Sequence, residues 1–515
     1  MKSVFICFFA VLFFNPQGIS QVQKLLKPVN WDSVAIWKEK INSSPDSIKY
    51  HHAYLKAIGW VGELYWYSEK YKSRFDSTEA EMSSQYAKWI EQFPNSSNVY
   101  QAIGTAYYES ESPKATAYLK KVIQLNPRAA ETYLQLAIDA ERWGDKQAAQ
   151  EYMRLASVTD PENPAYSFYY AMYFDEIDLN IFKEKIFALV AKFPAHERGA
   201  QGLYWLGYNM KSAEEKIKIY EELRTKYPPE KFSWSSSGMF SLFDQYLFTK
   251  RYSDAAALAE LLKAKQGWQD NLLFAKGLSH LNDLLGGKEY KAAYDSISKL
   301  KAARFSKFAN NLALLEAELA DKTGNTESGY KKLLSLQAKE PTDELYSAIM
   351  ELAGRLNKDK KTVNEDLWEI RKKTIKPATS FELGLYTSEK KLKLEDLRGK
   401  VVLITFWFPG CGPCRAEFPH FENVVKKFSN KELTYLGINV FPKQDDYVTP
   451  FMKGTKYSFI PLRGTSEWAE KAYNVRGEPT NFLIDKEGNI VFANFRTDQD
   501  NERTLELMIE SLLNK

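Results

Sequence analysis

Two cysteines separated by two residues carry the clearest chemical signal in the sequence. They lie in the segment Cys411-Gly412-Pro413-Cys414, between an apolar run, 401–406, and a helical pattern, 415–428. Unpaired N–H groups and the dipole at a helix N-terminus stabilise a thiolate, which is the attacking species in disulfide exchange. Cys414 follows one turn later on the same face, where it can attack a mixed disulfide and release a reduced substrate. We therefore predict a redox-active pair, with Cys411 as nucleophile and Cys414 as resolving thiol.

Two structural roles compete with this interpretation. A zinc half-site would need two further ligands, and only His420 is near in the sequence. An inert disulfide between Cys411 and Cys414 would close a very small loop and contribute little stability. The spacing favours dithiol exchange over both, and we predict no metal and no cofactor.

The elements that must position the pair follow Lys376-Pro377, where the sequence pattern changes. Apolar and alternating runs typical of strands are separated by helical patterns, and a hairpin turn is indicated between the last two strands. The predicted strands are 401–406, 433–440, 481–484 and 490–495, the helices 415–428, 447–456 and 501–513, and the hairpin 486–489. Strands joined through helices predict an α/β sheet.

This C-terminal part resembles the thioredoxin superfamily, in particular the exported TlpA/ResA-like thiol–disulfide oxidoreductases. The similarity extends from about residue 377 to the end of the chain. The motifs that carry it are Leu394–Lys400, Phe406-Trp407, Cys411–Arg415, Glu417-Phe418-Pro419, Glu478-Pro479-Thr480 and Phe482–Asp485. The resemblance implies a thioredoxin fold and disulfide-exchange activity.

The resemblance also assigns roles to residues around the dithiol. Pro479 matches the cis-proline that faces the cysteines, and lacking an N–H it leaves neighbouring backbone free to pair with a substrate strand. Glu417 matches an acidic residue that can relay protons to the pair. Trp407, Glu478 and Pro479 are predicted to form the substrate-binding side, with Trp407 mainly a packing residue beside it.

Three departures from the family pattern carry their own expectations. Thr405 stands where thioredoxins proper carry a buried Asp, so proton handling must differ, which raises interest in Glu417. Gly410 stands where an aromatic residue commonly precedes the first cysteine, and we expect that side of the site to be open. Glu478 places a negative charge where substrate docks and should disfavour acidic substrates.

The middle of the chain, from about 31 to 373, consists of amphipathic helical patterns separated by short polar turns. Prolines close these patterns at intervals of 33 or 34 residues, at Pro94, Pro127, Pro161, Pro194 and Pro228. This period resembles the tetratricopeptide repeat, whose stacked helix pairs leave a concave face suited to a peptide or protein partner. In the unit 130–161, the small residues Ala137 and Ala149 allow the two helices to approach closely.

The N-terminus and the composition indicate the compartment. An uncharged apolar run, Val4–Phe14, followed by the small residues of Gly18-Ile19-Ser20, predicts a signal peptide and hence export to the periplasm or cell envelope of a bacterium. Removal of the leader would leave Cys411 and Cys414 as the only cysteines of the three. The 70 Lys and Arg nearly balance the 66 Asp and Glu, which argues against a nucleic-acid partner.

The predicted organisation is multidomain, an all-α helical repeat solenoid followed by an α/β thioredoxin fold. The predicted segments are a signal peptide, 1–20; an N-terminal helical region, 21–91; tetratricopeptide-like repeats, 92–228; degenerate helical repeats, 229–370; a linker, 371–380; and the thioredoxin-like domain, 381–515.

The leading functional hypothesis is an exported thiol–disulfide oxidoreductase. The Gly-Pro pair between the cysteines matches thioredoxin, a reductant of about −270 mV, which favours a reductase. Such a role implies a protein disulfide client and a thiol electron donor in the membrane, and the repeats are expected to recruit the client or another protein.

Two other functions remain open. A peroxiredoxin-like peroxidase is suggested by the segment 408–411, although such enzymes place Thr or Ser three residues before the reactive cysteine and Phe408 stands there. A non-enzymatic scaffold, in which the thioredoxin-like domain is a docking module, is disfavoured because both cysteines and Pro479 are retained.

Overall fold

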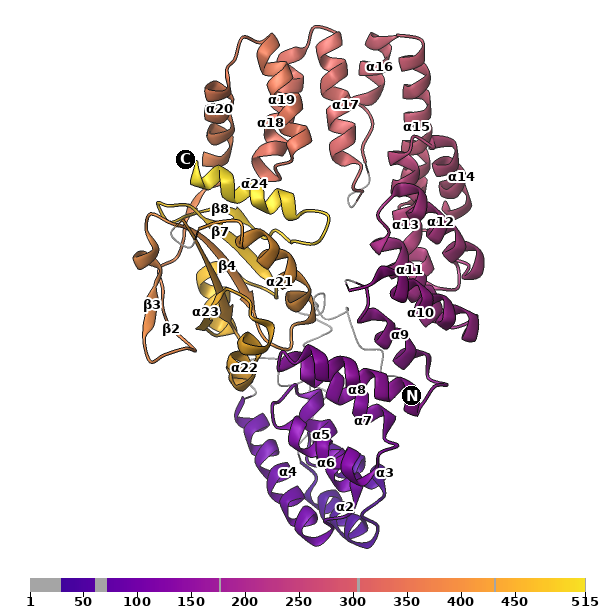
Figure 1. The fold of residues 1–515 in the computed structure, drawn as a ribbon, viewed down its shortest axis with the longest axis vertical. Coiled ribbons are helices and arrows are strands. Elements are labelled where there is room, and N and C mark those ends of the chain that lie inside the picture. Colours follow the sequence, from indigo (N-terminus) through magenta and orange to yellow (C-terminus); the bar gives the residue numbers. More distant parts are fainter. Residues whose placement is uncertain (1–28, 61–71, 176, 303–305, 430–431, 515) are drawn as a thin grey trace.

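A computed structural model of the chain describes residues 29–60, 72–175, 177–302, 306–429 and 432–514 (Figure 1). The predicted signal peptide, 1–20, lies outside the described residues. A long array of helices precedes a C-terminal domain built on a mixed β-sheet, which confirms the predicted fold class. None of the helices in the described part of the chain is long and apolar enough to cross a membrane.

The helical array follows the predicted period. Its helices are α2 Trp31–Ser43, α3 Ile48–Ala57, α4 Lys72–Gln92, α5 Ser97–Glu109, α6 Ala115–Leu125, α7 Ala130–Arg142, α8 Lys146–Thr159, α9 Pro164–Met172, α10 Leu179–Lys192, α11 Glu197–Asn209, α12 Ala213–Lys226, α13 Ser233–Phe248, α14 Tyr252–Leu262, α15 Trp268–Gly286, α16 Tyr290–Ile297, α17 Ala309–Lys322, α18 Thr326–Lys339, α19 Asp343–Arg355 and α20 Lys360–Lys372. Each proline of the period lies two residues after the end of α4, α6, α8, α10 or α12. Proline cannot continue a helix, so each one ends a pair of helices.

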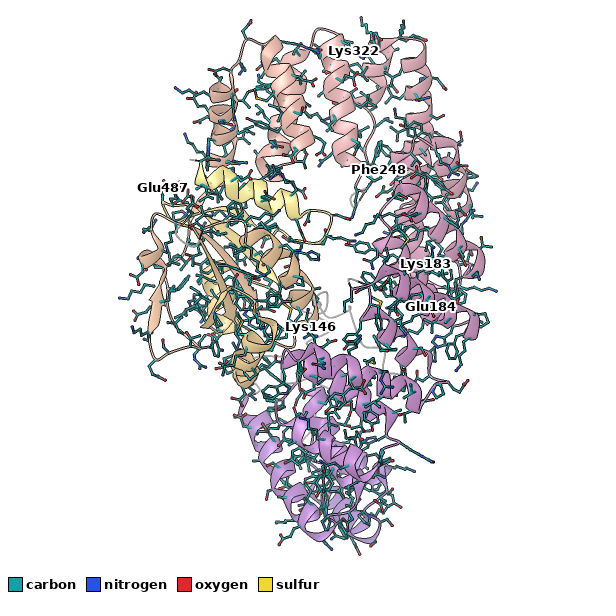
Figure 2. All side chains as sticks on the ribbon, in the orientation of Figure 1. Lys146, Lys183, Glu184, Phe248, Lys322 and Glu487 are labelled. Carbon is teal, nitrogen blue, oxygen red and sulfur yellow. A yellow bond between two sulfur atoms is a disulfide. The ribbon has the colours of Figure 1, made fainter. Side chains whose placement is uncertain are left out.

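Helices α7 and α8 form the unit that the sequence describes best. Ala137 and Ala149 are fully buried, and the two helices pack against each other, as predicted. Gly144 makes the turn with a φ of +76°, a conformation that glycine adopts without strain. Asp145 caps α8 by accepting a hydrogen bond from the backbone N–H of Ala148 at 2.9 Å. Charged side chains such as Lys183, on α10, are exposed to solvent (Figure 2).

The C-terminal domain contains a six-stranded sheet of order β1-β8-β7-β4-β5-β6. Its elements are β1 Lys376–Pro377, β2 Glu382–Gly384, β3 Lys391–Lys393, β4 Val401–Trp407, α21 Gly412–Val425, β5 Leu433–Asn439, α22 Asp445–Thr455, β6 Ile460–Arg463, α23 Ser466–Tyr473, β7 Thr480–Ile484, β8 Asn489–Ala493 and α24 Glu502–Leu513. Strands β4, β5 and β6 are parallel to one another, whereas β7 runs antiparallel to both β4 and β8. The predicted hairpin between the last two strands is confirmed.

Several elements differ from the sequence-based expectation, among them the short strands β2 and β3, which were not predicted. Strand β1 lies inside the segment predicted as a linker, 371–380, and pairs with β8, so this segment is part of the sheet. Strand β6 and helix α23 were not predicted, because β6 has four residues, one of them Pro461, and α23 has eight. Short segments such as these give too few residues for a period to be recognised.

Helices cover both faces of the sheet, and β4 is buried on each side. Trp407 packs against Phe418 of α21 and Phe451 of α22, whereas Phe406 packs against Tyr473 of α23. This alternation follows from the two-residue period of a strand. Helices α21, α22 and α24 therefore share one face with the odd-numbered residues of β4, and α23 lies on the other.

The array bends around the C-terminal domain and contacts it along several of its helices (Figure 1), and two of these contacts involve α22 and α24. At one, the Tyr447 hydroxyl of α22 donates a hydrogen bond to Asp139 Oδ1 of α7 at 2.5 Å. At the other, Arg503 of α24 pairs with Asp343 of α19, with Nε and Oδ2 2.8 Å apart. The concave side of the array thus holds part of the chain's own C-terminal domain.

The contact at α22 brings two backbones together. A Cβ placed on Gly144 would lie 2.8 Å from the Cα of Phe451, and one placed on Gly454 would lie 2.4 Å from the carbonyl oxygen of Gly144. Real Cβ atoms are not found this close to backbone atoms, so both positions need glycine. The turn between α7 and α8 is therefore an interdomain contact as well as a repeat feature.

Candidate active site

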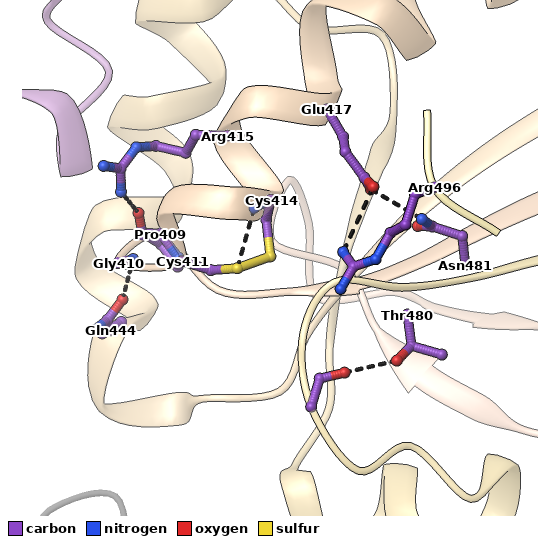
Figure 3. Close-up of a disulfide and its surroundings, with 11 residues drawn as sticks. Pro409, Gly410, Cys411, Cys414, Arg415, Glu417, Gln444, Thr480, Asn481 and Arg496 are labelled. Atoms are coloured by element: carbon purple, nitrogen blue, oxygen red, sulfur yellow. Dashed lines mark hydrogen bonds and ion pairs between the residues drawn. A yellow bond between two sulfur atoms is a disulfide. The ribbon is translucent and has the colours of Figure 1, made fainter. Parts of the chain in front are cut away.

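The dithiol lies where β4 leads into α21 (Figure 3). Cys411 is the N-cap of α21, and its Sγ accepts a hydrogen bond from the backbone N–H of Cys414 at 3.2 Å. The two cysteines form a disulfide, with their Cα atoms 5.3 Å apart. Cys411 is 4% exposed and Cys414 is fully buried. The predicted placement of Cys411 at a helix N-terminus is confirmed.

Trp407 does not contribute to a substrate surface. Its side chain is 0% exposed and packs edge-on against Phe418 and Phe459, with ring centroids 5.2 Å from each. A fully buried ring cannot touch a bound protein, so the prediction of Trp407 as a substrate-binding residue is wrong. Its role is the packing role that the sequence also suggested.

Pro479 follows a cis peptide bond from Glu478, as the family resemblance predicts. In the sheet register, Thr480 pairs with Phe406. Pro479 therefore precedes β7 at the end of the central strands where β4 leads to the dithiol. Pro479 itself is buried, and Glu478 is partly exposed beside it.

The predicted negative charge at Glu478 needs correction. Burial raises the pKa of this carboxyl to about 7, because the charged form is poorly solvated there. Glu478 is therefore charged in only part of the molecules at neutral pH. The sequence predicted the carboxyl but could not predict how strongly its surroundings exclude water.

Glu417 lies inside the domain, one helical turn after Cys414. Its Oε2 accepts a hydrogen bond from Asn481 Nδ2 at 2.9 Å, and its Oε1 lies 3.5 Å from Arg496 Nη1. Burial raises the pKa of Glu417, and these partners only partly offset the effect. Asn481 pairs in register with Thr405. The buried carboxyl that thioredoxins proper carry on the strand is thus replaced, on the same face of the sheet, by one carried on α21.

The side of the site next to Gly410 is filled, which corrects the expectation that it is open. The backbone N–H of Gly410 donates to Gln444 Oε1 at 2.6 Å, and Gln444 is 0% exposed. The carbonyl oxygen of Pro409 accepts from Arg415 Nη1 at 2.6 Å. Gln444 ends the short 3-10 helix Pro442–Gln444, and nothing in its sequence surroundings marks it as part of the site.

His420, the one candidate for a further zinc ligand, has a different partner. Its Nδ1 lies 2.7 Å from Glu502 Oε1 of α24. In the described ranges, no three side chains of His, Cys, Asp or Glu form a group that could hold a metal ion. Cys411 and Cys414 are instead paired with each other in a disulfide.

Comparison with known proteins places this domain in a family. Residues 375–493 match the AhpC/TSA family. Thiol-disulfide oxidoreductase ResA of Bacillus subtilis is 36% identical over 105 residues, which are 20% of this chain and 58% of that protein. Thioredoxin-like protein YneN of Bacillus subtilis is 31% identical over 134 residues, which are 25% of this chain and 77% of that protein.

Solved structures are similar over about a quarter of the chain. A putative thiol:disulfide interchange protein DsbE from Chlorobium tepidum is 28% identical and covers 26% of this chain and 95% of its own, with a TM-score of 0.24. A putative protein disulfide isomerase from Bacteroides thetaiotaomicron is 30% identical and covers 27% of this chain and 89% of its own, with a TM-score of 0.24.

The fold and the dithiol define a thioredoxin-like domain. Through this domain the chain belongs to the thioredoxin-like proteins of the AhpC/TSA family, and the domain is homologous to the ResA-type thiol-disulfide oxidoreductases. The chain spans 58% of the length of the ResA relative, and the helical array lies outside the matched residues.

Proposed function

We propose that this protein is a thiol–disulfide oxidoreductase that acts on protein disulfides. The observation that carries the proposal is the hydrogen bond from the Cys414 N–H to Cys411 Sγ at the start of α21. A sulfur at this position is stabilised when it is ionised, and its neighbour is within disulfide-bonding reach. The names of the ResA relatives agree with this chemistry.

The reaction begins with the reduced pair. The Cys411 thiolate attacks one sulfur of a client disulfide, which forms a mixed disulfide and releases one client thiolate. The Cys414 thiolate then attacks Cys411 Sγ and releases the second client thiolate. Two electrons pass from the dithiol to the client, the two client thiolates take up protons, and the Cys411–Cys414 disulfide remains.

Glu417 is proposed as the group that takes the proton from Cys414. Both side chains are buried, and Glu417 follows Cys414 by one turn on α21. A carboxyl whose pKa is raised by burial can accept and return a proton closer to neutral pH than an exposed one. Pro479 and Glu478, at the adjacent sheet edge, are proposed to contact the client backbone.

The setting of the reaction is proposed from the sequence. The apolar N-terminal run supports export to a bacterial envelope, the Gly-Pro pair supports the reducing direction, and a thiol donor in the membrane would then re-reduce the disulfide. The proline period supports a tetratricopeptide-like array that recruits a client or partner. Such a partner would use surfaces other than those that contact the C-terminal domain.

Reduction of insulin by the full chain, with dithiothreitol as electron donor, tests the proposal. We expect turnover in the wild type and none in Cys411→Ser. The variant Cys414→Ser should accumulate a mixed disulfide that runs as a larger species on a non-reducing gel. Insulin turnover that survives Cys411→Ser would favour the scaffold. Peroxide consumption at a rate comparable to insulin reduction would favour the peroxidase.

A further inference from the structure

The peptide unit between Pro409 and Gly410, just before the nucleophile, is hydrogen-bonded at both of its polar groups. Its carbonyl oxygen accepts from Arg415 and its N–H donates to Gln444, each at 2.6 Å. The turn is closed by the Cys411 N–H, which donates to the Phe408 carbonyl at 2.9 Å. Rotation of this peptide plane would break both hydrogen bonds. The two bonds therefore fix the plane and, with it, the Gly410 Cα from which the chain continues to Cys411.

Each bond is continued by a carboxylate from the helical array. Gln444 Nε2 donates to Glu111 Oε2 at 2.8 Å, and Arg415 Nη2 donates to Glu141 Oε2 at 3.0 Å. Glu141 is held by Tyr173, whose hydroxyl donates to its other oxygen at 2.6 Å. Glu111 is thus linked to the Gly410 N–H through Gln444, and Glu141 is linked to the Pro409 carbonyl through Arg415.

The turn and an ion pair at Glu111 set the position of its carboxylate. Glu111 lies in the turn between α5 and α6 with a φ of +51°, a left-handed conformation that Glu adopts only at an energetic penalty. Its Oε1 lies 3.4 Å from Arg142 Nη2, and the Arg142 side chain is 6% exposed. A buried guanidinium thus fixes the direction in which the Glu111 carboxylate points.

The glycine at position 410 allows the Glu111 carboxylate to lie close to the backbone before Cys411. A Cβ placed on Gly410 would lie 1.9 Å from Glu111 Oε2 and 2.8 Å from Gln444 Nε2. A side chain at position 410 would have to displace the Glu111 carboxylate and the Gln444 amide from the positions that they occupy. Gly410, which stands where the family resemblance would place an aromatic residue, leaves room for this carboxylate.

We propose that Glu111, acting through Gln444, is a positioning residue for the dithiol, with Glu141 and Arg415 as a second arm. The array supplies part of the redox site by fixing the Pro409–Gly410 peptide plane. This proposal rests on the proposed function, because positioning matters for catalysis only if the dithiol exchanges disulfides.

The experiment separates positioning from folding. Asn adopts the left-handed conformation readily but is too short to reach Gln444, so Glu111→Asn keeps the turn while losing the contact. It also removes a carboxylate partner of the buried Arg142, so the urea midpoint of the variant is measured first and alkylation is compared where both proteins are folded. In a Cys414→Ser background, we expect Glu111→Asn to slow the alkylation of Cys411 by iodoacetamide about tenfold at pH 7. This factor corresponds to the loss of one charge-assisted hydrogen bond. Glu111→Gln, which keeps an acceptor oxygen, should restore most of the rate. Glu131→Ala, at an exposed acidic position on α7, is the control.

Gly410→Ala provides the second test. The Cβ of Gly410→Ala should displace the Glu111 carboxylate, so this variant should also slow alkylation of Cys411. The double variant Glu111→Asn, Gly410→Ala should react no more slowly than either single variant, because both changes remove the same contact. An unchanged pH profile of alkylation in Glu111→Asn, or losses that multiply in the double variant, would overturn the proposal. Alkylation needs no client, so failure of insulin turnover in the wild type would refute the proposed function without affecting this result.

Discussion

The charge of Glu478 gives the sharpest prediction of substrate preference, because it changes within the physiological pH range. With a pKa of about 7, the carboxyl is ionised in roughly a tenth of molecules at pH 6 and roughly nine tenths at pH 8. Discrimination against acidic substrates should therefore appear as the pH rises through about 7. The variant Glu478→Gln keeps the shape of the side chain and removes the titration.

The size of the effect follows from the distance to a substrate charge. A carboxylate at ~8 Å, in a medium with an effective dielectric constant between ~20 and ~80, contributes about 0.5–2 kcal/mol, or roughly 2- to 30-fold in kcat/KM. The assay measures kcat/KM for two peptide disulfides that differ in one flanking residue, Lys or Glu, between pH 5.5 and 8.5. The ratio of the two values cancels the pH dependence of the cysteines.

We expect this ratio to favour the Lys peptide increasingly above pH 7 in the wild type and to stay constant in Glu478→Gln. A ratio that changes equally with pH in both proteins would refute the assignment of the charge to Glu478. Stability offers a second measure with a defined sign. A raised pKa in the folded state means that stability present below pH 4.5 is lost as the pH rises through about 7. The variant should therefore gain stability relative to the wild type over that range.

Three further predictions concern the dithiol and the interdomain contact. Cys411, freed by Cys414→Ser, should react with iodoacetamide at pH 6 at least about tenfold faster in the folded chain than in guanidinium, since the helix N-terminus stabilises its thiolate; equal rates would contradict this. Glu417→Gln should slow insulin reduction about 100-fold by removing the proton acceptor, with normal mixed-disulfide formation in stopped-flow; loss of both steps would indicate a structural role instead. Tyr447→Phe removes the hydroxyl that donates a hydrogen bond to the Asp139 carboxylate of α7. In urea denaturation it should lower the free energy of unfolding by about 1–3 kcal/mol. Tyr435→Phe is the matched control, because among the described residues the Tyr435 hydroxyl has no hydrogen-bond partner, and an equal loss in both variants would contradict the assignment.

Local sequence determined the parts of this protein that depend on neighbouring residues. The spacing of Cys411 and Cys414 at the start of a helical pattern placed the dithiol at the N-cap of α21, because helix entry is a local property. The prolines at intervals of 33 or 34 residues predicted where helix pairs end, since proline cannot continue a helix. Strand β4 was predicted because a continuous apolar run is typical of a strand that is buried on both faces.

Tertiary structure decided the properties that depend on burial and on residues distant in the sequence. It determined that Trp407 is too deeply buried to contact a substrate and that Glu478 titrates near neutral pH. It also placed Glu111 against Gly410, about 300 residues further along the chain, in a contact that no local pattern encodes. Desolvation and long-range packing arise only when separate elements come together, so the chemistry of the pair was readable in the sequence, whereas its environment was not.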